Sequence, residues 1–361
     1  MCQVYRETGA LQDLVADLES LRIDDLRTLD DISAFLRNYP DRRREMMEAA
    51  TQKAKQEKID LQAELAALNA LIAQRKAEKA AALEAEMAVL NMQLSAARNA
   101  DNRDFWTRIR MLWKAWFISR KLKQMQAGFD AKLNEAVAHL TAELDTKSGQ
   151  LQFIEEKFDQ AVISAAGLPF LEMERRKSAL DLSSLKYYGA IGEDRVARSL
   201  AALPEPSFLI NNFCLNFSKP LYYREEDSHI RSIQIDHLLI TAAGLFIIET
   251  KNWSAESMAN LSLRSPVQQI RRSGYALYRL LRSTDTARAM GLSGHHWGEI
   301  QLPVRNLLVF INQKPSVSFP YVKVLTVQEL NGYIQYFKPV FSASDTQRIG
   351  EYMLKICDRR V

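Results

Sequence analysis

Residues 41–127 contain no glycine and no proline, and this run constrains the fold more than any other feature of the chain. The run is rich in Ala, Glu, Lys, Gln and Leu, which favour helices. Its apolar residues recur at alternating spacings of four and three, the pattern of a coiled-coil seam; the first such set is Leu61, Leu65, Leu68 and Ile72. A second heptad seam lies between Leu133 and Phe158. The sequence therefore predicts a coiled coil over residues 41–165.

The arrangement of these helices has two alternatives. The seams could fold back on each other as an antiparallel hairpin, or run parallel between two chains. Comparable seam lengths, and breaks expected at residues 101–102 and at Gly128, favour the hairpin. Long apolar seams must be buried against something, so we also expect a homodimer or higher homo-oligomer through residues 41–165, for example two hairpins forming a four-helix bundle.

Residues 103–123 combine aromatic and basic side chains and would form the tip of such a hairpin. Three roles are open for them: packing of the tryptophans to close the tip, stacking on single-stranded nucleic acid, or contact with a membrane surface. Apolar residues in this segment recur at helical spacing, which favours packing.

The rest of the chain has a globular composition, with 47% hydrophobic and 25% charged residues. Residues 171–361 contain 24 Lys and Arg against 18 Asp and Glu, whereas residues 1–170 contain 24 against 26, so the C-terminal part suits a nucleic-acid partner better. Three dispersed cysteines predict neither a disulfide framework nor a cysteine zinc site. Without a signal sequence or a long apolar run, we expect a cytoplasmic protein with no transmembrane segment.

The remaining residues divide into three segments. Residues 1–40 have apolar positions at helical spacing, which predicts a short helical N-terminal segment for packing or oligomerisation. Gly167-Leu168-Pro169 ends the long helical region, so residues 166–185 are expected to form a linker. Helices and short strands then mix over residues 186–361, which predicts an α/β domain with a mixed central sheet flanked by helices.

Residues 233–253 contain two apolar, β-rich segments joined by the sequence Ala242-Ala243. If these two alanines form the loop, Asp236 lies opposite Glu249 on one face of a hairpin, and Lys251 shares that face. A three-residue loop would place Glu249 on the other face, and an ordinary exposed Glu-Lys pair is the alternative without chemistry. Two carboxylates beside an ammonium group can hold a divalent cation and activate a water, as phosphodiester cleavage requires.

Several short motifs in this domain resemble those of the nuclease-related domain (NERD) family, a branch of the PD-(D/E)XK nucleases. They are Gly192-Glu193, the Gln-Ile-Asp-His run ending at His237, the run from Gly244 to Trp253, and Ser265-Pro266-Val267-Gln268-Gln269. The family usually has Asn-Pro where this chain has Ser265-Pro266, which leaves Gln269 in register. The resemblance implies a restriction-endonuclease-like fold and metal-dependent cleavage of DNA.

The resemblance also implies roles for five residues. Asp236 and Glu249 would bind Mg²⁺, or Mn²⁺ in its place. Lys251 would stabilise charge or help to generate the attacking hydroxide. Glu193 would assist from the edge of the site, and Gln269 would form a hydrogen bond near the lysine or the scissile phosphate.

A predicted helix over residues 267–281 carries Arg271, Arg272 and Arg279. These arginines either contact DNA phosphates or belong to a solvated surface. His237 is expected to be a packed histidine because it points away from Asp236. The adjacent residues His295 and His296 are expected in a loop.

The predicted function is metal-dependent hydrolysis of DNA phosphodiester bonds, with a host-defence or DNA-processing role inferred from architecture alone. One alternative is a catalytically silent nuclease fold that binds DNA or a partner and works through its coiled coil. A second alternative is an adaptor that contacts a membrane surface through residues 103–123.

Overall fold

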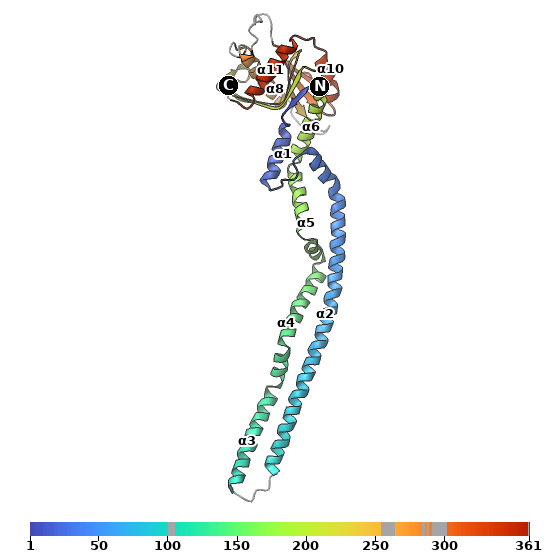
Figure 1. Ribbon diagram of the computed structural model, residues 1–361, viewed down its shortest axis with the longest axis vertical. Helices are drawn as coiled ribbons and strands as arrows, with labels where there is room; N and C mark the ends of the chain where they lie inside the picture. The colour runs from blue at the N-terminus through green and yellow to red at the C-terminus, as the bar shows by residue number, and fades with distance from the viewer. Residues whose placement is uncertain (100–104, 254–263, 284–285, 287–288, 291–301, 360) are drawn as a thin grey trace. The chain divides into compact units, whose positions relative to one another are not determined.

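A computed structural model describes residues 1–99, 105–253, 264–283, 286, 289–290, 302–359 and 361 (Figure 1). The chain divides into two compact units, which are considered separately here. The globular unit contains residues 1–39 and 174–361, and the hairpin unit contains residues 40–173. His295 and His296 lie outside the described residues. None of the helices in the described segments is long and apolar enough to cross a membrane.

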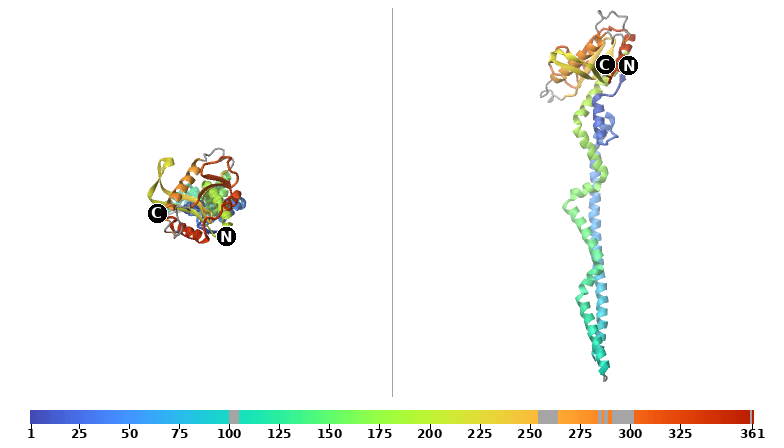
Figure 2. Two further views of the ribbon diagram at one scale, coloured as in Figure 1. Left: turned by 90° about the horizontal axis from the view of Figure 1, so that it is seen from above. Right: turned by 90° about the vertical axis from the view of Figure 1, so that its left-hand side faces the viewer.

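The globular unit is built on a six-stranded mixed sheet with the order β1-β2-β3-β4-β5-β6. Its strands are β1 (Gln3–Tyr5), β2 (Ser207–Tyr223), β3 (Ser228–Thr241), β4 (Gly244–Lys251), β5 (Val304–Phe310) and β6 (Val322–Thr326). β2, β3 and β4 pair in antiparallel fashion. β1 pairs parallel to β2 at one edge of the sheet. At the other edge, β5 pairs parallel to β4, and β6 pairs parallel to β5. The long β2–β3 hairpin, coloured yellow, extends from the body of the unit (Figure 2).

Helices cover both faces of this sheet. α6 (Ser184–Ala201) and α10 (Val327–Gln335) pack on one face through residues such as Leu200 and Leu330. α8 (Arg264–Leu281) and α11 (Ala343–Ile356) pack on the other face through residues such as Leu277 and Met353. The predicted mixed sheet flanked by helices is therefore confirmed.

The β3–β4 turn fixes the register on which the site depends. Thr241 pairs with Gly244, so Ala242 and Ala243 form a two-residue loop. Alanine is a poor residue for a tight hairpin turn, and this turn is held by its surroundings. The carbonyl of Ala242 accepts from the amides of Val340 and Phe341, and that of Ala243 accepts from Arg305. Gly244 has φ +129°, and a Cβ there would lie 2.6 Å from the carbonyl oxygen of Pro303.

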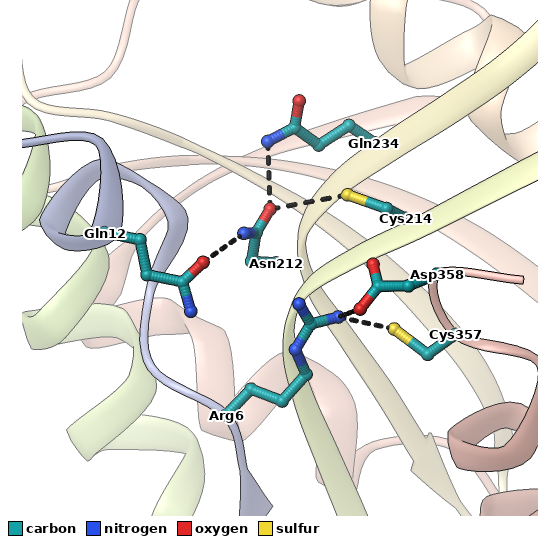
Figure 3. Close-up of polar contacts among 7 residues, drawn as sticks. All are labelled: Arg6, Gln12, Asn212, Cys214, Gln234, Cys357 and Asp358. Carbon is teal, nitrogen blue, oxygen red and sulfur yellow. Dashed lines mark hydrogen bonds and ion pairs between the residues drawn. The ribbon is translucent and has the colours of Figure 1, made fainter. Parts of the chain in front are cut away.

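Residues 1–40, expected to form a short helical segment, are helical over residues 9–20 and from residue 29 onward, but residues 3–5 form a strand of the sheet. β1 adds an edge strand, and Tyr5 stacks on Phe208 with ring centroids 6.0 Å apart. Arg6, which follows β1, donates to Cys357 and forms an ion pair with Asp358 at 2.9 Å (Figure 3). Backbone pairing with β2 and this C-terminal contact hold the first residues in the sheet.

α1 (Gly9–Ser20) is also anchored to the sheet. Asn212 of β2 donates to the side chain of Gln12 at 2.8 Å and accepts from Gln234 of β3 at 2.9 Å (Figure 3). The apolar side of α1 packs with the start of α2 (Leu29–Asn99) and the end of α5 (Phe158–Leu182). The N-terminal segment is thus an integral part of the globular unit.

Residues 166–185, expected as a linker, are largely helical. α5 continues to Leu182 after a break at Gly167, which has φ +73°, and α6 begins at Ser184. Ala179 and Leu180 are buried against α1, which explains why a charged stretch remains ordered. α2 also passes through Pro40 and so continues beyond the segment 1–40 without a break.

In the hairpin unit, α2 runs antiparallel to α3 (Phe105–Ala127), α4 (Phe129–Glu156) and the first part of α5 (Figure 1). Leu83 and Leu90 of α2 pack against Leu122 of α3, and Leu61 packs against Ile154 of α4. Ion pairs flank this seam, including Lys58–Glu155, Glu64–Lys147 and Glu86–Lys121. The leucines of α2 are therefore buried within one chain, and their burial does not by itself require a second chain.

The sequence favoured packing of the aromatic side chains of α3 to close the tip of the hairpin. The structure instead leaves them exposed. Trp106, Trp113 and Trp116 are 74%, 59% and 50% exposed, and Phe105 and Phe117 are 67% and 60% exposed. The helix instead buries Ile118, Leu122 and Met125 against α2. These residues lie on the other side of the helix, about 120–180° around its axis from Trp113.

Substitution of Gly192 should destabilise the globular unit. Gly192 is buried in α6, and a Cβ there would lie 2.9 Å from the Cβ of Asn252, just after β4. We expect Gly192→Ala to lower the free energy of unfolding by about 1–3 kcal/mol, because α6 must move away from the sheet. Urea denaturation followed by circular dichroism measures this change.

Gly332→Ala is the matched control, because Gly332 is also helical but has nothing within 4 Å of its added Cβ. This change should be neutral or stabilise by up to about 1 kcal/mol. Equal effects of the two substitutions would contradict the packing argument.

Candidate active site

Asp236 lies where β3 and β4 stop pairing with each other. Their last paired residues are His237 and Ile248, whereas β4 continues to pair with β5 as far as Lys251. At the point of separation, the backbone amide of Thr250 donates to Oδ2 of Asp236 at 2.8 Å. A carboxylate thus takes the place of a backbone acceptor and is fixed between the two strands.

Glu249 follows on the same sheet face and is only 4% exposed. Nζ of Lys251, two residues along β4, donates to Oε1 of Glu249 at 2.7 Å. Nε2 of Gln269, from the start of α8, donates to Oε2 at 3.2 Å. Strand alternation brings the glutamate and the lysine together, and the packing of α8 on this face adds the glutamine.

Glu193 reaches the same place from α6, on the other side of the sheet. Its Oε2 accepts a hydrogen bond from the backbone amide of Ala10 at 3.1 Å. Its neighbour Gly192 allows α6 to approach Asn252 and Thr250 closely. The separation of β3 from β4 explains how a side chain from the opposite layer comes near Asp236.

Burial raises the pKa values of all three carboxyl groups, and the charge of Asp236 raises those of Glu193 and Glu249 further. Burial and the charge of Asp236 raise the pKa of Glu193 to about 8. The same two causes raise the pKa of Glu249 to about 7, against the opposing effect of Lys251. Burial also raises the pKa of Asp236. Burial acts to lower the pKa of Lys251, but the charges of Glu249, Asp236 and Glu193 outweigh it and raise the value, so the lysine remains an ammonium group.

This cluster has one cation for three acids, and that imbalance suits a divalent cation. Oxygen donors from carboxylates are the ligands that Mg²⁺ prefers, and Mg²⁺ commonly uses only one or two of them together with water and phosphate. No group of three or more His, Cys, Asp or Glu side chains within the described ranges is arranged to hold a metal ion by itself. Asp236 and Glu249 therefore fit a site of two protein carboxylates.

The five residues proposed for catalysis come together, whereas two of the three arginines are already used in ion pairs. Arg271 forms an ion pair with Glu225 at 2.8 Å, and Arg272 forms one with Glu226. Both acids therefore have guanidinium partners from α8. Arg279 is exposed on α8 and lies two to three helical turns beyond Gln269.

His237 is a packed histidine, as its strand position predicted. It is fully buried, and its Nδ1 is 2.8 Å from the side-chain oxygen of Asn211. Its Nε2 has no hydrogen-bond partner in the part of the chain that the structure describes. Burial lowers the pKa of His237 to about 3, so the ring is neutral.

Two contributors to the site are backbone amides that sequence reasoning did not identify. Ala10 supports Glu193 from a segment far away in the chain, and Thr250 supports Asp236. Asn252 is a third contributor, because its side chain donates to the carbonyl of Tyr188 at 2.8 Å and ties the end of β4 to α6. Only Asn252 had a signal in the sequence, as part of the Glu-Thr-Lys-Asn-Trp run.

The raised carboxyl pKa values should make stability depend on pH when no divalent cation is present. The ordinary pKa is 4.5 for Glu193 and Glu249, against about 8 and about 7 in the folded domain. Above pH 4.5, the folded state therefore binds more protons than the unfolded state. The free energy of unfolding should be greatest below pH 4.5 and should fall as the pH rises through 7 and 8. The fall should be up to about 1.4 kcal/mol per pH unit for each proton.

Urea denaturation in EDTA between about pH 6 and about pH 9 measures this dependence. Glu193→Gln should flatten it, whereas Glu351→Gln, on the outer side of α11, should leave it unchanged. A wild-type slope in Glu193→Gln would show that this carboxyl titrates normally.

Comparison with known proteins agrees with the geometry. The family model of the nuclease-related domain matches residues 188–311, about a third of the chain, and includes the described site residues Glu193, Asp236, Glu249, Lys251 and Gln269. No curated protein and no solved structure matches the chain. The match begins within α6 and ends just after β5, so it contains the strands that build the site. The chain therefore carries a nuclease-related domain, which follows a long helical region in the sequence.

Proposed function

We propose that the globular unit hydrolyses DNA phosphodiester bonds with Mg²⁺, or with Mn²⁺ in its place. The convergence of Asp236, Glu249 and Lys251 where β3 leaves β4 is the observation that carries this proposal. Asp236 and Glu249 would hold the cation, which when bound would supply positive charge to the phosphate and lower the pKa of a water. The excess of buried negative charge supports this assignment.

The lysine acts as a source of positive charge. Because its pKa is raised, Lys251 stays protonated and stabilises negative charge on a phosphoryl oxygen in the transition state. Its hydrogen bond to Glu249 fixes the position of the ammonium group before substrate binds. Gln269 holds the other oxygen of the same carboxylate, so it orients Glu249.

Glu193 assists from the opposite layer. With a pKa of about 8, it carries a proton at neutral pH when no cation is present. A nearby positive charge would favour its ionised form. Glu193 is then placed to accept a proton from a water at the site edge, while the amide of Ala10 holds its other oxygen.

The alternative is a silent module that binds DNA or a partner and works through the helical region. One observation favours it: both oxygens of Glu249 already have partners, Lys251 and Gln269. A cation would have to share these oxygens. DNA binding without cleavage, in both Mg²⁺ and Mn²⁺, would support this alternative.

Glu249→Gln should fold normally and lose cleavage. The amide keeps the shape of the side chain but removes the negative charge that a cation needs, so we expect a loss of at least about 100-fold in rate. Purified protein is incubated with plasmid and linear DNA in Mg²⁺, Mn²⁺ or EDTA, and products are followed on gels. Glu351→Gln is the control, because Glu351 is an exposed glutamate on α11. A fully active Glu249→Gln variant would remove this residue from the site.

DNA binding should weaken as salt increases, because phosphate contacts release counterions. Arg271 and Arg272 already have carboxylate partners, so Arg279 is the arginine of this helix best placed to contribute. Arg279→Ala should reduce the slope of log affinity against log salt by about 1. Fluorescence anisotropy with labelled DNA measures the slope, and Lys355→Ala on α11 is the control. An unchanged slope in Arg279→Ala would place the DNA elsewhere.

The homodimer and the cytoplasmic location stay predictions. The seam leucines have partners within one chain, so they no longer provide an argument for a dimer. The expectation now rests on the exposed apolar side chains of α2, namely Ile59, Leu71, Val89 and Met92. Two hairpins that bury these residues would form the four-helix bundle considered from the sequence.

A further inference from the structure

We propose that the solvent-facing side of α3 binds the anionic surface of a lipid membrane. This aromatic face contains large apolar side chains that are all at least half exposed: Phe105, Trp106, Leu112, Trp113, Trp116 and Phe117. Single exposed apolar residues are common, but a continuous group of this size marks an interaction site. The inference is independent of the proposed nuclease chemistry, because it concerns a different unit of the chain.

The aromatic face is not a remnant of the hairpin seam. α3 already buries Ile118, Leu122 and Met125 against α2, and this stripe satisfies its packing within the hairpin. Trp113 lies nine residues before Leu122 in the sequence, which turns it about 180° around the helix. The helix thus has a second apolar side that faces away from the side packed on α2.

Charge identifies the partner. α3 contains six basic residues and no acidic one: Arg108, Arg110, Lys114, Arg120, Lys121 and Lys123. All six are exposed, and Lys121 alone is used in an ion pair with α2, through Glu86. The guanidinium group of Arg120 lies 5.5 Å from the centre of the Trp116 ring. Cationic groups therefore border the aromatic rings, which is the composition of helices that lie in the headgroup layer of anionic membranes.

The geometry of the rings favours a membrane over single-stranded nucleic acid. Trp113 and Trp116 meet edge to face, with centroids 6.0 Å apart and planes at 73°. Trp116 and Phe117 do the same, at 5.0 Å and 81°. Stacked bases need open ring faces as platforms, whereas these rings cover one another and form one joined apolar surface. Tryptophan at the boundary between lipid and water needs no such platform.

A second copy of the same face is a poor occupant. Apposition of two α3 helices would bury the aromatic rings but bring six basic residues of each chain together without an acidic residue on either helix. Like charges at such an interface repel. Anionic headgroups instead neutralise the basic residues while the rings enter the layer beneath them.

Vesicle flotation with the full chain tests the proposal. The vesicles contain phosphatidylcholine alone, or phosphatidylcholine with about a third phosphatidylserine. The chain should float with the anionic vesicles, and its tryptophan fluorescence should shift to shorter wavelength. Trp113→Ser with Trp116→Ser should weaken this binding at least about tenfold. Lys114→Gln with Arg120→Gln should weaken it about 30-fold, because two cationic contacts are lost.

Phe153→Ser with Ile163→Ser is the matched control, since it removes two exposed apolar side chains from α4 and α5 of the same hairpin unit, away from the side chains of α2 proposed for the dimer. This pair should float like wild type. Circular dichroism checks that every variant keeps its helices.

Three results would overturn the proposal. The first is no flotation with anionic vesicles, or flotation that both α3 variants retain. The second is that the tryptophan variant loses binding to a labelled oligothymidylate but not to vesicles, which would assign the face to single-stranded nucleic acid. The third is a dimer by light scattering that the tryptophan variant alone disrupts, without vesicle binding by wild type, which would assign it to a second copy.

Discussion

The hydrogen bond from the amide of Thr250 to Asp236 is the interaction on which the site depends. It replaces a backbone ladder contact between β3 and β4, so the strands separate without leaving this amide unpaired. The separation allows Glu193 to approach from α6, while β4 stays paired to β5 and holds Glu249 and Lys251 on the other side. By accepting this backbone hydrogen bond, Asp236 thus allows side chains from the helices on both faces of the sheet to reach one site.

This arrangement brings three carboxyl groups together in a buried region, where the charged form of each is unfavourable. Burying carboxylates costs free energy unless they gain partners, and the raised pKa values of Glu193 and Glu249 show that Lys251 alone is insufficient. The N-terminal segment reduces the cost by supplying the amide of Ala10. Under the proposed function, stability and activity would be opposed here, because the same unbalanced negative charge that costs stability would attract a divalent cation.

The hairpin unit shows a similar division between packing and function. Its leucine seam is satisfied inside one chain, by contacts such as Leu61 with Ile154. The aromatic rings of α3 are therefore surplus to the fold, although their spacing alone resembled a core stripe. A helical period shows which residues share a side of a helix, but two apolar sides look alike until one of them has a partner.

The sequence by itself predicted the mixed α/β fold and the helical region, because hydrophobic period and strand alternation are local properties. It left two β3–β4 registers open, and the observed two-residue loop is the one that places Asp236, Glu249 and Lys251 on one face. Tertiary structure decided how the Ala242-Ala243 turn is held, since its hydrogen bonds come from Arg305 and residues 340–341. It decided that Arg271 and Arg272 pair with Glu225 and Glu226, and that β1 joins the sheet. These contacts join residues far apart in the chain, and no local pattern encodes which distant partner each group will meet.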